Sequence, residues 1–277
     1  CKTPYYEFLV KMIDPVKLTF VTARESQKEI TNFYLHTTVK KKTTEKALTA
    51  FTNPYTGLEG VSRQKITYKR EDGINLSGNL YLPKGYDKER DGALPVLMWA
   101  YPIEYKSAAD ASQVRGSKNT FTRPNYGSPV LWVTRGYAVL DNAEMPIVGE
   151  NGKEPNDNFI PQLYLNAHAA IQTLANMGVG DSTRVAVGGH SYGAFMTANL
   201  LAHTNLFKAG IARSGAYNRT LTPFGFQGEE RTYWEAPEVY NSMSPFAYAD
   251  KIKTPLLLIH GDADNNTGTF PLQSERL

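Results

Sequence analysis

The sequence predicts an α/β fold, in which a mostly parallel sheet carries helices on both faces. Two observations favour this class. Short continuous apolar runs, which are typical of strands buried on both faces, recur along the chain from about residue 95. Segments with the apolar spacing of a helix stand between several of these runs, and strands that alternate with helices form parallel sheets. The sequence has no internal repeat and no low-complexity tract.

The first part of the chain has a different pattern. Residues 17–22 and 32–37 alternate between apolar and polar side chains with the strand period, which predicts an antiparallel pair. Because two strands alone are at best marginally stable, we expect them to belong to a larger all-β domain. The turn-rich stretch 52–60 predicts a linker. The expected domains are therefore residues 1–58 and residues 59–277.

The elements of the second domain follow in order. Strands at 64–69 and 76–82 are joined by the hairpin signal Asp72-Gly73. The remaining elements are short buried strands and apolar helices, predicted as strands at 95–100, 137–140, 184–187, 209–212 and 255–259 and as helices at 163–177 and 194–202.

The composition excludes several classes of protein. Thirty Lys and Arg against 27 Asp and Glu give a net charge of +3, and the longest basic run, Lys40 to Lys42, is too short to indicate a nucleic-acid surface. Cys1 is the single cysteine, which excludes an internal disulfide and a cysteine-based metal site. Apolar runs such as 94–101 are too short to span a bilayer. We expect a soluble protein without cofactor, metal, membrane or nucleic-acid partner, in the periplasm, the cytoplasm or the plastid stroma.

The motif Gly189-His190-Ser191-Tyr192-Gly193 carries the sharpest functional signal. It matches G-x-S-x-G between a predicted strand and a predicted helix, which is the setting of a nucleophile elbow in an α/β-hydrolase fold. The two glycines leave room for a tight turn. Ser191 would stand at the helix N-terminus, where the helix dipole and the Tyr192 backbone N–H stabilise negative charge on an attacked carbonyl.

A serine nucleophile needs a base, and the base needs a carboxylate that orients it. In this fold the acid follows a late buried strand, which leaves Asp262 and Asp264 as alternatives after the strand at 255–259. The pattern of the loop does not separate the two. A calcium loop is excluded, because Thr267 stands where such a loop needs Gly and Gln273 where it needs Glu.

The histidines do not complete this arrangement. Because the fold places the base after the acid, and no histidine follows Asp264, we expect the catalytic histidine beyond Leu277. The sequence begins at Cys1 rather than Met and stops at Leu277 in what reads as the start of a helix, so we expect a fragment cut at both ends, with little or no turnover of its own. Structural roles are expected for the five histidines, which are His36, His168, His190, His203 and His260.

Long strings around these motifs resemble the prolyl oligopeptidase family of serine peptidases. These strings are GGHSYGAF at 188–195 and DKIKTPLLLIHGD at 250–262. Three further strings are similar to a narrower branch, the glutamyl endopeptidases of chloroplasts and bacteria. They are WAYP at 99–102, QVRGS at 113–117 and RSGAYNRTLTPFGFQ at 213–227. The resemblance implies an α/β-hydrolase fold preceded by a β-propeller, of which the first domain would hold the last strands.

The resemblance also implies roles for individual residues. Ser191 matches the nucleophile, and Asp264 matches the aspartate of the triad. The backbone N–H of Tyr192 and the hydroxyl of Tyr101 match the two donors of the oxyanion hole, where fixed donors stabilise the developing charge. Asn266 matches a position that contacts the backbone of the substrate.

The resemblance implies hydrolysis of peptides through an acyl-enzyme, with a preference for Glu before the scissile bond. Recognition of Glu needs a cation near Ser191, since guanidinium pairs bidentately with carboxylate. Two alternatives stay open, a carboxylesterase of the same fold and a non-catalytic binding protein, the second because no histidine follows the acid. The candidate cations are Arg115, Arg213, Arg219 and Arg231.

Overall fold

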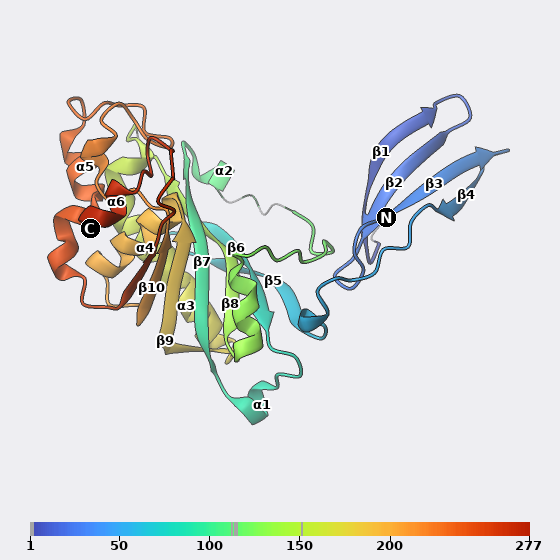
Figure 1. Ribbon diagram of the computed structural model, residues 1–277, viewed down its shortest axis with the longest axis horizontal. Coiled ribbons are helices and arrows are strands. Elements are labelled where there is room, and N and C mark those ends of the chain that lie inside the picture. The colour runs from blue at the N-terminus through green and yellow to red at the C-terminus, as the bar shows by residue number, and fades with distance from the viewer. Residues whose placement is uncertain (1–2, 112, 114–115, 151) are drawn as a thin grey trace. The chain divides into compact units, whose positions relative to one another are not determined.

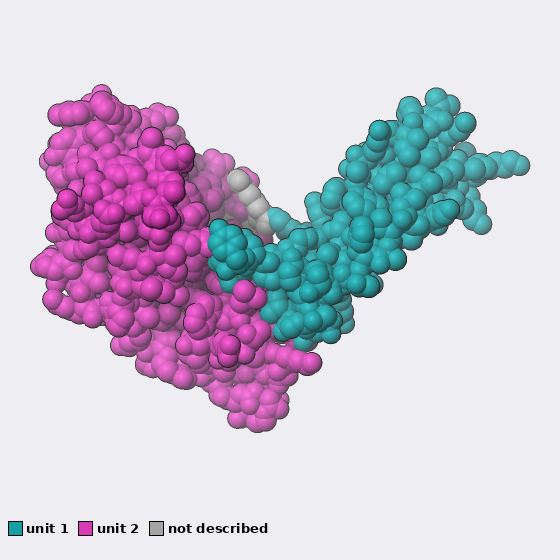
Figure 2. Space-filling view, in the orientation of Figure 1, with its two compact units in different colours: residues 1–59, 115–128 teal, residues 60–114, 129–277 magenta. Residues whose placement is uncertain are grey.

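The computed structural model describes residues 3–111, 113, 116–150 and 152–277. The chain divides into two compact units, shown in different colours in Figure 2. Unit 1 consists of residues 1–59 and 115–128, and unit 2 consists of residues 60–114 and 129–277. A segment from the middle of the sequence therefore belongs to the first unit, which no local pattern indicates.

Unit 1 is built on a four-stranded antiparallel sheet, in which the strands pair in chain order (Figure 1). Strands β2 (Thr19–Glu25) and β3 (Asn32–Val39) are the two that the sequence predicts. Strands β1 (Tyr6–Asp14) and β4 (Lys42–Ala47) are not predicted, because neither alternates. All six residues of β4 are exposed, and β1 carries consecutive apolar side chains.

Charged side chains connect the strands of this sheet. Arg24 on β2 donates hydrogen bonds to Glu7 on β1 and to Glu45 on β4. His36 lies beside the same two carboxylates, so three ligand-type groups meet in one place. Because the Arg24 guanidinium already bonds both carboxylates, it neutralises the charge that a metal ion would otherwise balance.

The segment 115–128 is held in unit 1 by a buried carboxylate. Glu25, at the end of β2, accepts a hydrogen bond from the backbone N–H of Phe121 and pairs with Arg123. This pairing keeps the pKa of Glu25 below its ordinary value despite its burial, which raises the pKa. Contacts between residues about a hundred positions apart thus fix the composition of unit 1.

Unit 2 is built on a seven-stranded sheet with the order β11-β10-β9-β7-β8-β6-β5. The five strands from β11 to β8 are parallel, while β6 and β5 add an antiparallel edge. Every predicted strand of this part is present, with bounds β5 (Ser62–Lys69), β6 (Asn75–Leu82), β7 (Leu94–Tyr105), β8 (Ala138–Val148), β9 (Gly180–His190), β10 (Ala209–Arg213) and β11 (Leu256–Ile259). Figure 1 shows the parallel strands side by side.

The two long helices cover one face of this sheet. Helices α3 (Phe159–Asn176) and α4 (Tyr192–His203) contact each other as well as β9, so they lie on the same side. The shorter helical segments are α1 (Lys88–Asp91), α2 (Ala108–Ala111), α5 (Pro237–Met243), α6 (Leu272–Arg276) and the 3₁₀ turns η1 (Thr56–Leu58), η2 (Pro129–Arg135), η3 (Pro155–Asn158), η4 (Arg219–Leu221) and η5 (Pro245–Lys251).

Burial shows how far each face is covered. Val96 and Met98 of β7 join the main core with α3 and α4, while Leu97, between them, is buried on the opposite face, where η2 contacts β7. Leu257 and Ile259 on the edge strand β11 remain 55% and 44% exposed. The second face is therefore covered near its centre and open at the β11 edge. Among the described helices, none has the length and apolar composition that a membrane-spanning segment requires.

Candidate active site

Ser191 lies on the turn between β9 and α4. Its backbone has φ 56° and ψ −115°, in a region that costs a residue other than glycine about 1–3 kcal/mol. The surrounding structure holds this conformation. The Ser191 N–H donates to the carbonyl of Arg213 at 2.9 Å, and the Ser191 carbonyl accepts hydrogen bonds from Ala194 and Phe195. The turn thus presents the serine side chain at the carboxyl end of the sheet.

The glycines of the motif are required by close backbone contacts. A Cβ on Gly189 would lie 2.4 Å from the carbonyl carbon of Gly193. A Cβ on Gly193 would lie 2.3 Å from the carbonyl oxygen of Ala100. Neither contact is with a side chain that could move aside. The turn therefore packs directly against the backbone of β7 at Ala100, which Tyr101 follows.

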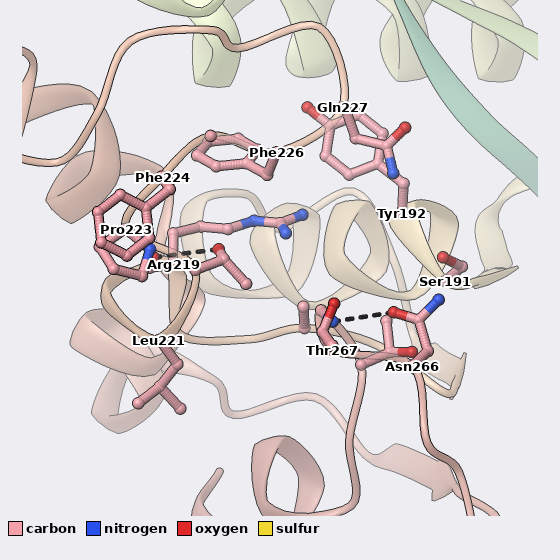
Figure 3. Close-up of a pocket in the computed structure, with 15 residues that line it drawn as sticks. Ser191, Tyr192, Arg219, Leu221, Pro223, Phe224, Phe226, Gln227, Asn266 and Thr267 are labelled. Atoms are coloured by element: carbon pink, nitrogen blue, oxygen red, sulfur yellow. Dashed lines mark hydrogen bonds between the residues drawn. The ribbon is translucent and has the colours of Figure 1, made fainter.

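Ser191 lines a pocket of about 530 Å³. Two further segments complete the lining, part of the β10–α5 segment (residues 214–236) and the end of the acid loop (residues 260–269). Figure 3 shows Ser191 and Asn266 on one side of this group and Phe224 on the other, with the Arg219 side chain extending between them below Phe226. Because β9, β10 and β11 are adjacent and parallel, the segments that follow them meet at one edge of the sheet.

The two acids of the acid loop differ in their surroundings. Asp264 is partly buried and accepts hydrogen bonds from the backbone N–H of Asn266 at 3.0 Å and from the hydroxyl of Thr269 at 3.5 Å. Its other neighbour is His260, whose Nε2 lies 3.4 Å from Oδ2. Asp262 is exposed. The loop thus holds Asp264 at its inner side and leaves Asp262 in solvent.

The charge of Asp264 reaches the elbow. Burial and the adjacent charge of Arg213 hold the pKa of His190, the neighbour of Ser191, below its ordinary value. The negative charge of Asp264 has a smaller effect and raises that pKa. The ring of His190 is turned toward the end of β10, with Nδ1 3.2 Å from the carbonyl of Arg213.

Within the described residues, no histidine side chain forms a hydrogen bond with the hydroxyl of the candidate nucleophile. All five lie in the described part, and within it the Ser191 hydroxyl forms no hydrogen bond. His260 is the histidine that contacts Asp264, but its nitrogens face the hydroxyl of Ser274 at 2.6 Å and the carbonyl of Thr269 at 2.5 Å. Its position supports a role in shaping the acid loop.

Two tyrosines flank the serine from different elements. Tyr192 begins α4, where the first backbone N–H groups have no partner within the helix. Tyr101 on β7 packs edge-on against the Tyr192 ring, with 5.9 Å between ring centroids. Its hydroxyl is exposed and donates to Oε1 of Gln227 at 3.3 Å. Tyr192 is thus part of the elbow and lines the pocket, whereas Tyr101 contacts the elbow through the Tyr192 ring and is not among the lining residues.

Sequence reasoning missed two residues that support these tyrosines. Gln227 lines the pocket with φ 51° and accepts the Tyr101 hydroxyl. Glu104 accepts a hydrogen bond from the Tyr192 hydroxyl at 2.7 Å, and its burial raises the pKa of the carboxyl group. Neither lies in a motif with a fixed spacing. The string that ends at residue 227 contained Gln227 but gave no reason to single it out.

The arginines that the sequence offers as the cation for glutamate differ in whether they line the pocket. Arg219 lines the pocket. Arg213 approaches His190, with 3.3 Å between Nε and Nδ1, and Arg231 pairs with Glu229 and Asp157 outside the lining. Arg115 lies outside the described residues.

Comparison with known proteins agrees with this geometry. The family model described as "Prolyl oligopeptidase family" matches residues 164–274. A protein of Oryza sativa subsp. japonica named "Probable glutamyl endopeptidase, chloroplastic" is 50% identical over 99% of this chain, and its namesake in Arabidopsis thaliana is 49% identical over 99%. The chain spans 30% and 29% of the lengths of these two relatives.

Solved structures agree on the fold. The crystal structure of Porphyromonas gingivalis dipeptidyl peptidase 4 superposes with a TM-score of 0.68, at 18% identity, over 98% of this chain and 37% of that one. The matched region 164–274 contains the elbow, much of the pocket and the acid loop. The sequence match identifies residues 164–274 as a region of the prolyl oligopeptidase family.

Proposed function

We propose that the full-length protein is a serine peptidase that cleaves peptide bonds through an acyl-enzyme on Ser191 and prefers Glu before the scissile bond. One observation carries the proposal. Ser191 occupies a strained turn between a parallel strand and a helix, and it faces a pocket that the acid loop also lines. The names of the two plant relatives support the preference for Glu.

The proposed reaction is acyl transfer. The Ser191 Oγ attacks the carbonyl carbon of the scissile bond. The proton of the hydroxyl passes to an imidazole between Ser191 and Asp264, which would belong to the histidine that the chain order of this fold predicts after the acid. The Tyr192 N–H and the Tyr101 hydroxyl donate to the oxyanion that forms. The imidazole then protonates the leaving amine. A water molecule, activated by the same imidazole, attacks the ester and releases the acid product and Ser191.

Gln227 has a positioning role in this scheme. In the absence of substrate it accepts the Tyr101 hydroxyl, so it holds the phenol at the rim of the pocket. Asn266 has the proposed role of binding the substrate backbone, because it lines the same pocket and is exposed. Its Oδ1 accepts the Gly268 N–H at 2.9 Å, which leaves the amide nitrogen of the side chain available as a donor.

The two units have separate proposed roles. Residues 59–277, apart from the segment 115–128 that belongs to unit 1, form the hydrolase domain, which contains the pocket. Residues 1–58 represent the terminal strands of a β-propeller, a proposal supported by their sequential antiparallel pairing in a four-stranded sheet.

The proposal is tested on the full-length protein with Ser191→Ala. We expect the variant to lose hydrolysis of a fluorogenic glutamyl peptide amide and covalent labelling by a fluorophosphonate. Ser214→Ala is the matched control, because Ser214 also has a positive φ, of 50°, after the neighbouring strand β10. A Ser191→Ala protein that still hydrolyses the peptide would exclude the proposed nucleophile. A wild-type protein that cleaves a simple glutamyl ester but not the peptide amide would instead be a carboxylesterase.

A further inference from the structure

The pocket contains a buried positive charge that no acidic side chain neutralises. Arg219 is only 4% exposed. Its Nε has no hydrogen-bond partner, and the guanidinium forms no ion pair with any residue in the described part of the chain. Burial lowers the pKa of Arg219 to about 10, which still leaves it charged at neutral pH. A buried charge without a partner is costly to keep, so its presence needs an explanation.

A second buried arginine shows how the same fold satisfies such a group. Arg70 is 3% exposed and donates five hydrogen bonds, two of them to the carboxylate of Asp72. Its other acceptors are Pro146, Asn166 and Gln162. The difference in hydrogen bonding indicates that the two buried arginines have different roles. Arg70 connects elements of the core, whereas Arg219 has donors without acceptors.

Aromatic rings hold the Arg219 guanidinium in place. Its carbon lies 4.0 Å from the ring centroid of Phe195, 4.3 Å from that of Phe226 and 5.3 Å from that of Tyr192. Such contacts stabilise a cation but satisfy none of its N–H groups. Figure 3 shows the side chain extending among the lining residues, with Phe226 beside the guanidinium. The rings therefore fix the plane of the group and leave its N–H edge for a ligand.

The carboxylate whose charge acts on Arg219 already has a hydrogen-bond partner. Glu104 raises the pKa of Arg219 through its charge, but it forms no ion pair with the arginine and accepts the Tyr192 hydroxyl at 2.7 Å. The other candidate cations do not compete for the pocket. Arg231 is neutralised by Glu229 and Asp157, and Arg213 does not line the cavity.

We propose that Arg219 is the specificity-determining residue of the pocket, binding through its guanidinium the side-chain carboxylate of the substrate residue before the scissile bond. The inference rests on the proposed peptidase function and adds the group that reads the substrate. A planar guanidinium, already ordered by its rings, matches a carboxylate with two parallel hydrogen bonds. Phe226 and Pro223, which also line the pocket, offer apolar surface to the methylene groups of a glutamate.

The test measures a ratio of rates on the full-length protein. Two quenched-fluorescence peptides differ only in having Glu or Gln before the cleaved bond. For the wild type we expect kcat/KM to be about 100-fold higher with Glu, as a charge-assisted hydrogen bond allows. In Arg219→Met the ratio should fall to near 1, while cleavage of the Gln peptide persists and shows that the site is folded. Arg219→Lys should keep a reduced preference for Glu.

Arg231→Met is the matched control, because it removes a neighbouring arginine outside the lining, and its Glu-to-Gln ratio should stay at the wild-type value. An unchanged ratio in Arg219→Met, or in Arg219→Lys if the first variant does not fold, would overturn the inference. So would a wild-type ratio near 1 with Ser191-dependent cleavage of both peptides, a result that leaves the peptidase proposal intact. Cleavage of neither peptide by the wild type would instead reject the peptidase itself.

Discussion

Replacing Arg219 by methionine should make the folded protein more stable. The arginine is buried without an acceptor for its N–H groups, so folding removes a charge from water without replacing its hydrogen bonds. Methionine fills a similar space and keeps contacts with the aromatic rings. Replacement of a residue that serves binding can raise the stability of the fold, whereas replacement of a residue that serves stability lowers it.

The magnitude follows from the pKa. Burial holds the pKa of Arg219 at about 10, against its ordinary value of 12.5. Each unit corresponds to about 1.36 kcal/mol, so burial of the cation costs about 3 kcal/mol. Loss of the cation–π attraction between the guanidinium and the rings offsets about 1–2 kcal/mol of this gain. The free energy of unfolding of Arg219→Met should therefore be about 1–2 kcal/mol higher than that of the wild type.

The pH dependence has a definite sign. The pKa of Arg219 is lower in the folded state than in the unfolded state, so the unfolded chain binds more protons between about pH 10 and pH 12.5. The stability of the wild type therefore rises with pH across that window, and the whole cost is present at pH 7. The gain in Arg219→Met should be at its maximum there.

Urea unfolding of the chain, followed by tryptophan fluorescence, measures this difference. All three tryptophans, Trp99, Trp132 and Trp234, belong to unit 2, which contains Arg219. Arg70→Met is the matched control, and the loss of its charged hydrogen bonds should lower the free energy of unfolding by about 2–3 kcal/mol. A loss of stability in Arg219→Met comparable to that of the control would refute the reasoning.

Three further predictions concern the elbow and its surroundings. Gly193→Ala should lower the free energy of unfolding by about 1–3 kcal/mol, since the new Cβ meets a backbone oxygen, whereas Gly261→Ala meets nothing within 4 Å and should be neutral in the same urea titration. Burial raises the pKa of Asp141 to about 6 from 3.8, so the folded wild type loses stability as the pH rises through that window and the buried carboxyl group ionises. The free energy of unfolding of Asp141→Asn should therefore be about 2–3 kcal/mol higher than that of the wild type at pH 7.5 and equal to it near pH 3.5. Tyr192→Phe should lower stability by about 1.5–3 kcal/mol in thermal unfolding, because buried Glu104 loses a donor, and an unchanged midpoint would contradict that hydrogen bond.

Local patterns were sufficient for most of unit 2. The hairpin at Asp72-Gly73, the parallel strands and the two long helices each leave an apolar signature, and all are present, although β7, β8 and β9 extend several residues beyond the predicted bounds. Elements without such a signature were missed. Strand β4 is polar except for Ala47, and α5 has seven residues, of which two are buried, too few to show the apolar spacing of a helix.

The sequence by itself determined the elbow. Gly189 is needed because its backbone passes close to that of Gly193, and that requirement is local, whereas the need for glycine at 193 comes from Ala100 on a distant strand. It likewise determined that an acid loop follows the last parallel strand, because chain order alone brings that loop to the edge where Ser191 stands. Such features depend on residues that are neighbours along the chain, so their spacing records them.

Only the tertiary structure decided which arginine faces the pocket. Four arginines were equal in the sequence, and burial among three aromatic rings distinguishes Arg219. The hydrogen bond from Tyr101 to Gln227 joins residues 126 positions apart, and Glu25 binds a segment nearly as distant. The reason is physical: the burial of a charge and the partner of a donor depend on which loops pack together, and irregular loops leave no periodic pattern in the sequence from which that packing could be predicted.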